Sequence, residues 1–290
     1  MSANAPRTRK CGTMAADTRQ LELDPSLRSA RLRLESQTRL RRSTNIVARR
    51  GVLTIPVIVH VVFNTDRQNI SDAQVQSQIN VLNLDFRAQN PDLANVPDVW
   101  RPLATDAQLQ FRLADVRRVQ TDRPSYVDDK VKFTETGGSP VVDPARNLNI
   151  WVCNLDEVLG YAYLPGVDSS IDGVVINFEC FGTEGTAASP FNLGRTATHE
   201  VGHYLNLLHI WGSETPSCSD SDEVDDTPNQ SQPNFSKPNF PHISCNNGPN
   251  GDMFMNYMDY VDDDSMFMFT AQQVVRMRTA LGEGRPNLGQ

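Results

Sequence analysis

The sequence predicts an α/β domain followed by a small, irregular C-terminal part, and three features of the pattern predict it. Residues 55–63 form a continuous β-branched run that is typical of a buried strand. Shorter strand-like runs cover 109–113, 148–153 and 173–178, and helical periodicities lie between them. Residues 212–251 are rich in Pro, Asn, Ser and Asp and show no periodicity, and one last helical pattern closes the chain.

Capping signals mark the helices. Ser71 with Gln74 predicts a capping box that opens a helix, whose apolar positions Val75, Ile79, Leu82 and Phe86 recur at helical spacing. A second helix is predicted over 192–205. Thr270 with Gln273 predicts the cap of the last helix, whose inward residues are Val274, Met277 and Leu281.

The 290 residues suffice for one substantial core, or for one catalytic domain with an appendage. The net charge of −8 is unevenly divided, because residues 1–50 carry 12 Arg/Lys against four Asp/Glu and the remainder has a formal charge of −16. This asymmetry predicts a basic arm docked on an acidic body, or a solvated tail beside a soluble surface. Nucleic-acid binding is not indicated, because the body is anionic.

The first eleven residues carry positive charge without an apolar core, so no signal peptide is visible. Export would use a leader removed beforehand, or another route. No apolar run approaches the roughly 18 residues that a membrane span needs. We therefore expect no membrane partner.

Five cysteines are present, and an odd number leaves at least one thiol unpaired in a monomer. Cys218 and Cys245 bracket much of the irregular segment, where a disulfide would restrict the unfolded chain most usefully. That pairing implies an oxidising compartment. No pairing is predicted for Cys153 and Cys180.

A metal-binding pattern lies in the second predicted helix. His199 and His203 are four residues apart and therefore share one helix face, where two imidazoles can bind one zinc ion. Glu200, beside the first ligand, can take a proton from water at that metal. The alternative is a helix with two surface histidines.

His209 is the predicted third ligand. It follows so closely that the chain must turn sharply out of the helix, and Asn206 is a residue type that tolerates the positive φ of such a turn. Three histidines leave a fourth zinc position open for water, as in catalytic sites.

These residues resemble a known family. HEVGHYLNLLH is similar to the extended zinc motif of the metzincin peptidases, with Asn206 where most members have glycine. Five further stretches resemble the pappalysin family, of the ulilysin and cytophagalysin kind. They are LNIWVCNL at 148–155, GYAYLP at 160–165, DGVVIN at 172–177, the DDTPNQ loop and NYMDYVDDDSMFMFTAQQVVRMR. The resemblance covers about residues 51–285.

The resemblance implies a metzincin fold with a twisted mixed sheet, a backing helix and an active-site helix above the substrate. Residues 51–211 would form this upper subdomain, and residues 212–290 a small lower subdomain with one closing helix. Residues 1–50 would be a basic pro-segment. The stretch GYAYLP, whose final proline suits a sheet edge, would pair with extended substrate backbone.

The resemblance also assigns two residues of the lower subdomain. Met258 corresponds to the Met-turn, an apolar floor beneath the zinc histidines, although a plain core methionine would differ little physically. Tyr260 resembles the tyrosine that hydrogen-bonds the tetrahedral oxyanion, with a purely structural role as the alternative.

The implied activity is that of a secreted zinc endopeptidase acting on proteins or peptides. Glu200 is expected to act as general base and then to protonate the leaving amine. Two other classes remain open. A gluzincin or deacetylase would be a different zinc hydrolase, against which the spacing of Asn206 and His209 argues. A non-catalytic binding module would carry a dead site, against which the presence of Glu200 argues.

Oxygen ligands are dense in the irregular segment, and such ligands suit Ca²⁺. The DDTPNQ stretch resembles the calcium-binding loop of the family. The candidate ligands are Asp222, Asp225, Asp226 and Thr227. A merely solvated acidic loop is the alternative.

Four aspartates follow Met258, where metzincins build the pocket for the residue after the cut. A carboxylate at the base of that pocket would select Arg or Lys by charge-assisted pairing. Asp264 is the candidate, from its place in the ulilysin-like pattern. Four surface carboxylates would be the alternative.

Cys11 lies in the basic arm, in RKCGT. Its thiolate could occupy the fourth zinc position, as in the cysteine-switch latency of some metzincins, or it could be a solitary cysteine in a disordered tail. If the enzyme cuts before Arg, residues 48–51 (ARRG) are a predicted self-cleavage site. The chain is therefore expected to be made as a latent zymogen.

Overall fold

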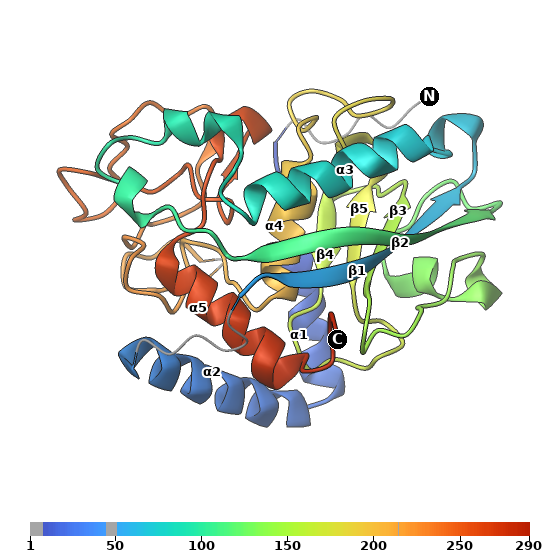
Figure 1. The fold of residues 1–290 in the computed structure, drawn as a ribbon, viewed down its shortest axis with the longest axis horizontal. Coiled ribbons are helices and arrows are strands. Elements are labelled where there is room, and N and C mark those ends of the chain that lie inside the picture. The colour runs from blue at the N-terminus through green and yellow to red at the C-terminus, as the bar shows by residue number, and fades with distance from the viewer. Residues whose placement is uncertain (1–7, 45–50, 214) are drawn as a thin grey trace.

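The predicted α/β fold is confirmed. The computed structural model describes residues 8–44, 51–213 and 215–290, in which helices pack against a mixed sheet (Figure 1). None of the helices in these ranges combines the length and the apolar character that crossing a membrane requires.

The sheet has five strands in the order β2-β1-β3-β5-β4. Their bounds are β1 Leu53–Phe63, β2 Leu109–Gln120, β3 Leu148–Cys153, β4 Gly160–Ala162 and β5 Val174–Asn177. β4 pairs antiparallel with β5 at one edge, and all other neighbours are parallel. The central part of β1 is buried on both faces, which explains its uninterrupted apolar sequence.

Helices α3 (Asp72–Asp85) and α4 (Arg195–Tyr204) pack against each other and against the sheet, α3 on β2 and α4 on β4 and β5. The Ser71 hydroxyl caps α3 by accepting from Gln74 N, but the predicted capping box forms only by half. The Gln74 side-chain amide is used instead to satisfy buried carbonyl groups of the loop after β5. Helix α4 begins three residues later than predicted, after Gly194 in the left-handed conformation.

Helix α5 (Ala271–Thr279) closes the fold and continues as a π turn over Ala280–Gly284. The capping box of Thr270 and Gln273 is complete, as predicted.

The irregular segment is held by polar side chains and by one disulfide. Cys218 and Cys245 are bonded, so the predicted pairing is confirmed. The buried carboxylate of Asp259 accepts from Gln230 Nε2 at 2.9 Å and from Asn234 N at 2.8 Å. A two-residue parallel pair, β6 (Phe235–Ser236) with β7 (Tyr260–Val261), ties the segment to the chain after Met258. These bonds hold the segment in place of the helix or strand packing that a periodic apolar pattern would provide.

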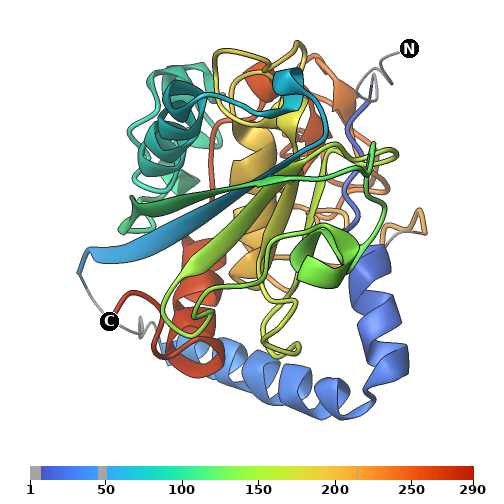
Figure 2. The same ribbon diagram turned by 90° about the vertical axis from the view of Figure 1, so that its right-hand side faces the viewer.

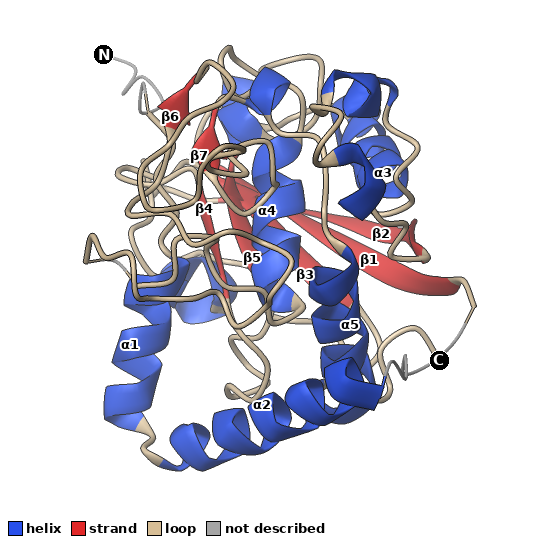
Figure 3. Ribbon diagram, turned by 90° about the vertical axis from the view of Figure 1, so that its left-hand side faces the viewer, coloured by secondary structure: helices blue, strands red, loops and turns tan. Residues whose placement is uncertain are grey.

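The basic arm docks on the body, which decides between the two interpretations of its charge. Helix α1 (Thr13–Leu23) lies beside the edge strand β4, and α2 (Ser26–Thr44) crosses beneath the domain to α5 (Figures 2 and 3). Ion pairs join α2 to acidic residues of the body: Arg39 to Glu223, Arg41 to Glu283, and Arg42 to Asp225.

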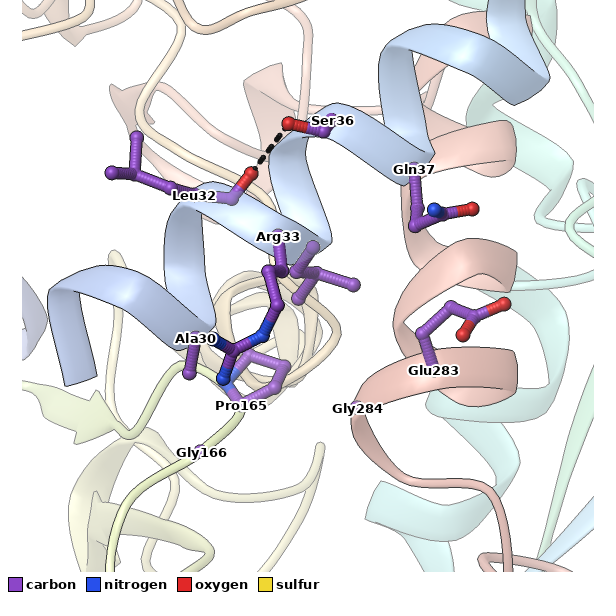
Figure 4. A pocket seen from close by; sticks show the side chains of 10 residues that line it. Ala30, Leu32, Arg33, Ser36, Gln37, Pro165, Gly166, Glu283 and Gly284 are labelled. Atoms are coloured by element: carbon purple, nitrogen blue, oxygen red, sulfur yellow. Dashed lines mark hydrogen bonds between the residues drawn. The ribbon is translucent and has the colours of Figure 1, made fainter. Parts of the chain in front are cut away.

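A cavity of about 560 Å³ lies in the seam between α2 and the body (Figure 4). Arg33 and Gln37 of α2 line it on one side, and Pro165, Glu283 and Gly284 on the other. The arm therefore does not pack against the body along its whole length.

Candidate active site

Three histidine side chains meet at one point. Nε2 of His203 lies 3.1 Å from Nε2 of His199 and 3.1 Å from Nε2 of His209. All three residues are fully buried. The first two project from one face of α4, and His209 follows the end of that helix.

Backbone carbonyl groups fix the protonation of two rings. Nδ1 of His199 lies 2.7 Å from the Tyr257 oxygen, and Nδ1 of His203 lies 2.8 Å from the Leu207 oxygen. Because a carbonyl only accepts, each Nδ1 carries the proton and each Nε2 presents a lone pair. Burial, followed by the neighbouring imidazoles, lowers the pKa of both histidines well below the usual value, so both rings are neutral.

Lone pairs that face one another at this distance repel unless a cation lies between them. Zinc binds histidine nitrogens tetrahedrally at about 2.0–2.1 Å, which separates two ligand nitrogens by about 3.3 Å. The observed 3.1 Å fits that spacing. Across residues 8–44, 51–213 and 215–290, the one group of three or more His, Cys, Asp or Glu with ligand-like spacing is this trio together with Cys11, all within 4.8 Å of one another.

The chain turns sharply between the second and third histidines. Asn206 adopts φ +73°, the left-handed conformation that the spacing predicts. Gly202, one turn earlier, permits close contact with the chain below, because a Cβ there would lie 2.6 Å from Met258 Sδ. Met258 is fully buried and packs directly beneath α4.

Aromatic rings surround His209. Trp211 stacks on its imidazole with centroids 4.2 Å apart, and the Tyr260 ring lies edge-on to both, 4.9 Å from His209 and 4.6 Å from Trp211. Sequence reasoning missed Trp211, because its position two residues after the third histidine does not reveal which way its ring faces.

Glu200 is 1% exposed and faces the arm. Its Oε2 accepts a hydrogen bond from the Thr13 hydroxyl at 2.9 Å and from the Cys11 thiol at 3.3 Å. Burial raises the pKa of Glu200 to about 7, although those two hydrogen bonds lower it. Gly160 of β4 leaves room for this side chain, since a Cβ there would lie 3.0 Å from Glu200 Cγ.

The arm runs along β4 in the parallel direction and brings Cys11 to the histidines. Gly12 N donates to Gly160 O, and Leu159 N donates to Lys10 O, both at 2.9 Å. Cys11 N also donates to the Tyr260 hydroxyl at 3.3 Å. Burial, then the charge of Glu200, raises the pKa of the Cys11 thiol well above its usual value.

Arg9 fills a buried pocket next to the histidines. Its guanidinium donates from Nη2 to Asp263 Oδ1 at 2.6 Å, from Nε to Val261 O at 3.1 Å and from Nη1 to Thr196 Oγ1 at 3.1 Å. The guanidinium carbon lies 5.0 Å from the centre of the Phe191 ring. Both members of the Arg9–Asp263 ion pair have fully buried side chains.

Asp264, the residue predicted for the base of a specificity pocket, lies at the surface. Its side chain is 48% exposed and pairs with Lys237 at the surface. Asp263 points inward instead, and its Oδ2 accepts from Leu193 N at 2.8 Å. The two neighbours diverge because residues 263–265 form a 3-10 turn.

Of the four predicted calcium ligands, Asp222 and Thr227 contact each other, whereas Asp225 and Asp226 have other partners. Thr227 donates its hydroxyl proton to Asp222, 2.9 Å from each carboxylate oxygen. Asp226 accepts hydrogen bonds from the first residues of α5, and Asp225 is exposed and pairs with Arg42 of the arm. Asp222 alone of the three carboxylates is buried.

The predicted self-cleavage site falls largely outside the described residues, because 48–50 belong to the range 45–50. Cys153 and Cys180 are buried free thiols far from one another in the sequence.

Comparisons with known proteins agree with this geometry. Residues 139–282 match the family described as pregnancy-associated plasma protein-A. A protein named extracellular metalloprotease, from Trichophyton verrucosum, is 33% identical over 233 residues, which cover 78% of this chain and 76% of the relative.

Two solved structures of Tannerella forsythia proteins have the same fold. A promirolysin variant is 42% identical with a TM-score of 0.88, and the match covers 97% of each chain. Mature mirolysin in complex with a cleaved peptide is 46% identical with a TM-score of 0.81, and that match covers 83% of this chain and 96% of the other.

Fold and site together define a metallopeptidase of the metzincin type. Within that class the chain belongs to the pappalysin family and is a zinc metalloendopeptidase.

Proposed function

We propose that the chain is a secreted, latent endopeptidase that hydrolyses peptide bonds preceding arginine or lysine once its first 50 residues are released. The observation that carries this proposal is the double occupancy of the site by the arm. Cys11 lies at the three histidines, and Arg9 fills the carboxylate pocket beside them.

The residues that would hold zinc are His199, His203 and His209, whose Nε2 atoms converge on one point. When bound, zinc supplies Lewis acidity that polarises the scissile carbonyl and makes water more acidic. In the latent chain Cys11 would be the fourth ligand.

Glu200 is the proposed general base and acid. Its carboxylate lies next to the ligand cluster, where Cys11 and Thr13 occupy the space that water and substrate would take. It would remove a proton from the attacking water and deliver it to the leaving amine.

Tyr260 is the proposed hydrogen-bond donor to the oxyanion. Its hydroxyl accepts a hydrogen bond from the Cys11 amide at 3.3 Å. The hydroxyl therefore reaches the backbone of the arm segment that lies next to the histidines. The neighbouring stack of Trp211 and His209 limits where the ring can go. Met258 would support the site from below by its contact with Gly202.

The edge strand β4 is the proposed docking strand for substrate backbone. The arm already uses the free edge of Gly160 in this way, with two backbone hydrogen bonds. Gly160 serves here because a larger residue would collide with Glu200 and with the backbone of β5.

The pocket of Asp263 is the proposed specificity pocket for the residue after the cut. It offers three acceptors to one planar guanidinium: a carboxylate, a hydroxyl and a backbone carbonyl. The planar guanidinium of arginine has separate N–H donors for all three acceptors. The compact ammonium group of lysine cannot match that geometry. Asp263 therefore takes the role that the sequence suggested for Asp264.

Calcium is proposed to stabilise the irregular segment near Asp222 and Thr227. Burial raises the pKa of Asp222 to about 7. Its hydrogen bonds and the positive charge of Arg276 lower the pKa, but they offset the effect of burial only in part. Hard carboxylate and hydroxyl oxygens at one buried place suit Ca²⁺.

Secretion is proposed from two observations. The Cys218–Cys245 disulfide requires an oxidising compartment. Relatives of this chain from Trichophyton verrucosum and Colletotrichum graminicola are named extracellular metalloproteases.

A digestion experiment tests the proposed activity. The full-length chain and its Glu200→Ala variant are incubated with casein and with a peptide library, with and without a zinc chelator, and cut sites are read by mass spectrometry. We expect chelator-sensitive cleavage before Arg or Lys that begins only as the arm is lost, and none from Glu200→Ala although it still binds zinc. Activity in Glu200→Ala, or cuts mainly before apolar residues, would contradict the proposal.

A further inference from the structure

A hydrogen bond from α5 reaches the turn that carries the third histidine. Asn206 lies just past the end of α4, so its carbonyl group is outside the helical ladder. Nε of Arg276 donates to that carbonyl oxygen at 2.6 Å. Arg276 is 3% exposed and Asn206 4%, so this bond is shielded from water.

A second arginine meets the same end of α4. Nε of Arg285 donates to Tyr204 O at 3.1 Å, and its guanidinium carbon lies 3.6 Å from the centre of the Tyr204 ring. Cations at a helix C-terminus offset the partial negative charge of its last carbonyl groups. The helix that carries two of the histidines therefore ends against two buried guanidinium groups from the C-terminal segment.

The position of this turn bears on two ligands. The Leu207 carbonyl, next in the chain to Asn206, accepts the Nδ1 proton of His203. The chain then reaches His209 within two residues. A shift of the Asn206 carbonyl would therefore change both the orientation of the second ring and the reach of the third.

Arg276 is held from its other side as well. Its Nη1 lies 2.6 Å from Glu35 Oε2 of α2, and both side chains are largely buried, at 4% and 18% exposed. The guanidinium thus connects the arm, α5 and the turn. Both partners of the bond between Arg276 and Asn206 belong to the body rather than to the arm.

We propose that Arg276 is a positioning residue of the metal site, which fixes the turn after α4 so that Nε2 of His209 stays within reach of a zinc ion held by His199 and His203. This goes beyond the roles assigned above and rests on the proposed zinc site. Outer contacts that orient ligands typically change metal affinity about 10- to 100-fold when removed.

The test measures zinc retention by the full-length chain. Zinc-loaded wild type and the variants Arg276→Met and Arg276→Lys are mixed with a chromophoric chelator, and the rate of zinc transfer is followed. Arg278→Met is the matched control, because Arg278 is on the same helix and equally buried but donates to Gly51 O. Glu35→Gln controls for loss of the arm contact.

We expect Arg276→Met to lose zinc about tenfold faster than wild type, with Arg276→Lys in between and both controls within about twofold. Equal rates for Arg276→Met and Arg278→Met would overturn the proposal. If Arg276→Met does not fold, Arg276→Lys decides, since a wild-type rate for that variant would show that the Nε donor is dispensable. A wild-type chain without bound zinc would instead contradict the proposed metal site.

Discussion

Arg9 and Asp263 form an ion pair of 2.6 Å in which neither side chain is exposed to solvent. If the proposed specificity holds, the arm carries the kind of residue that the pocket would bind in a substrate. Specificity and latency would then be linked through one carboxylate, and substitutions at that carboxylate should change both.

Asp263→Asn should lower kcat/KM for peptides with arginine after the cut by about 10- to 100-fold, because a charge-assisted hydrogen bond contributes about 1.5–3 kcal/mol. Peptides with an apolar residue there should change little. The measurement is kcat/KM on matched peptides with the arm removed. Asp264→Asn serves as control, and an equal loss in that variant would argue against the assignment to Asp263.

Thr196→Val should reduce the preference for arginine over lysine about 3- to 10-fold, because it removes one of three acceptors and keeps the shape of the side chain. Competition between an arginine and a lysine peptide in one reaction measures this ratio directly. An unchanged ratio would show that the hydroxyl does not take part in discrimination.

Cys11→Ser should shorten the delay before activity appears by roughly tenfold or more, since each 1.4 kcal/mol lost from the attachment of the arm is a factor of ten. The time course of arm loss on gels, with activity followed in parallel, measures the delay. Lys10→Ala, at an exposed neighbouring position, is the control. A delay unchanged in Cys11→Ser would refute the role of the thiol.

Removal of calcium should lower the melting temperature by roughly 5–10 °C, if the ion is present at about 100 times its dissociation constant. The measurement is a thermal melt with and without a calcium-selective chelator. Asp222→Asn should melt at the same temperature in both. A chelator effect that survives in Asp222→Asn would place the ion elsewhere.

Without calcium, stability should fall as the pH rises from about 4 to about 7. The pKa of Asp222 is raised to about 7 in the folded chain, so the folded state binds more protons than the unfolded state across that window. Denaturant melts at several pH values measure the slope. Asp222→Asn should make the slope less steep without abolishing it, because burial also raises the pKa of Glu200 to about 7. An unchanged slope would assign the effect to other groups.

The zinc histidines and the strands could be predicted from the sequence because each depends on local spacing. His199 and His203 share a helix face at any position in a fold, and Asn206 signals its turn by residue type. The continuous apolar run of β1 likewise predicts that this strand is buried. These features need no knowledge of distant residues.

The buried pocket that holds Arg9 could not be predicted in this way, because its parts come from separate regions of the chain. Arg9 is one of 11 arginines in the first 50 residues, and nothing local marks it as buried. Asp263 and Asp264 are neighbours in an acidic run, and only the 3-10 turn decides which one faces inward. In the sequence, Arg276 is simply a basic residue of the last predicted helix. Its contact with the turn after α4 is evident only from the structure.

Two ion pairs of α2, those of Arg39 and Arg42, differ in kind from the contact of Arg9, whereas the pair of Glu35 with Arg276 is largely buried. Arg39 is 63% exposed and its partner Glu223 37%, and Asp225 opposite Arg42 is 80% exposed. Pairs in contact with water are weak and are screened by salt, whereas the Arg9 pair is shielded. Higher ionic strength should therefore weaken the contacts of Arg39 and Arg42 before the contact of Arg9. Salinity would then loosen the end of α2 that carries Arg39 and Arg42 while the shielded pair of Arg9 and Asp263 still holds the segment next to Cys11.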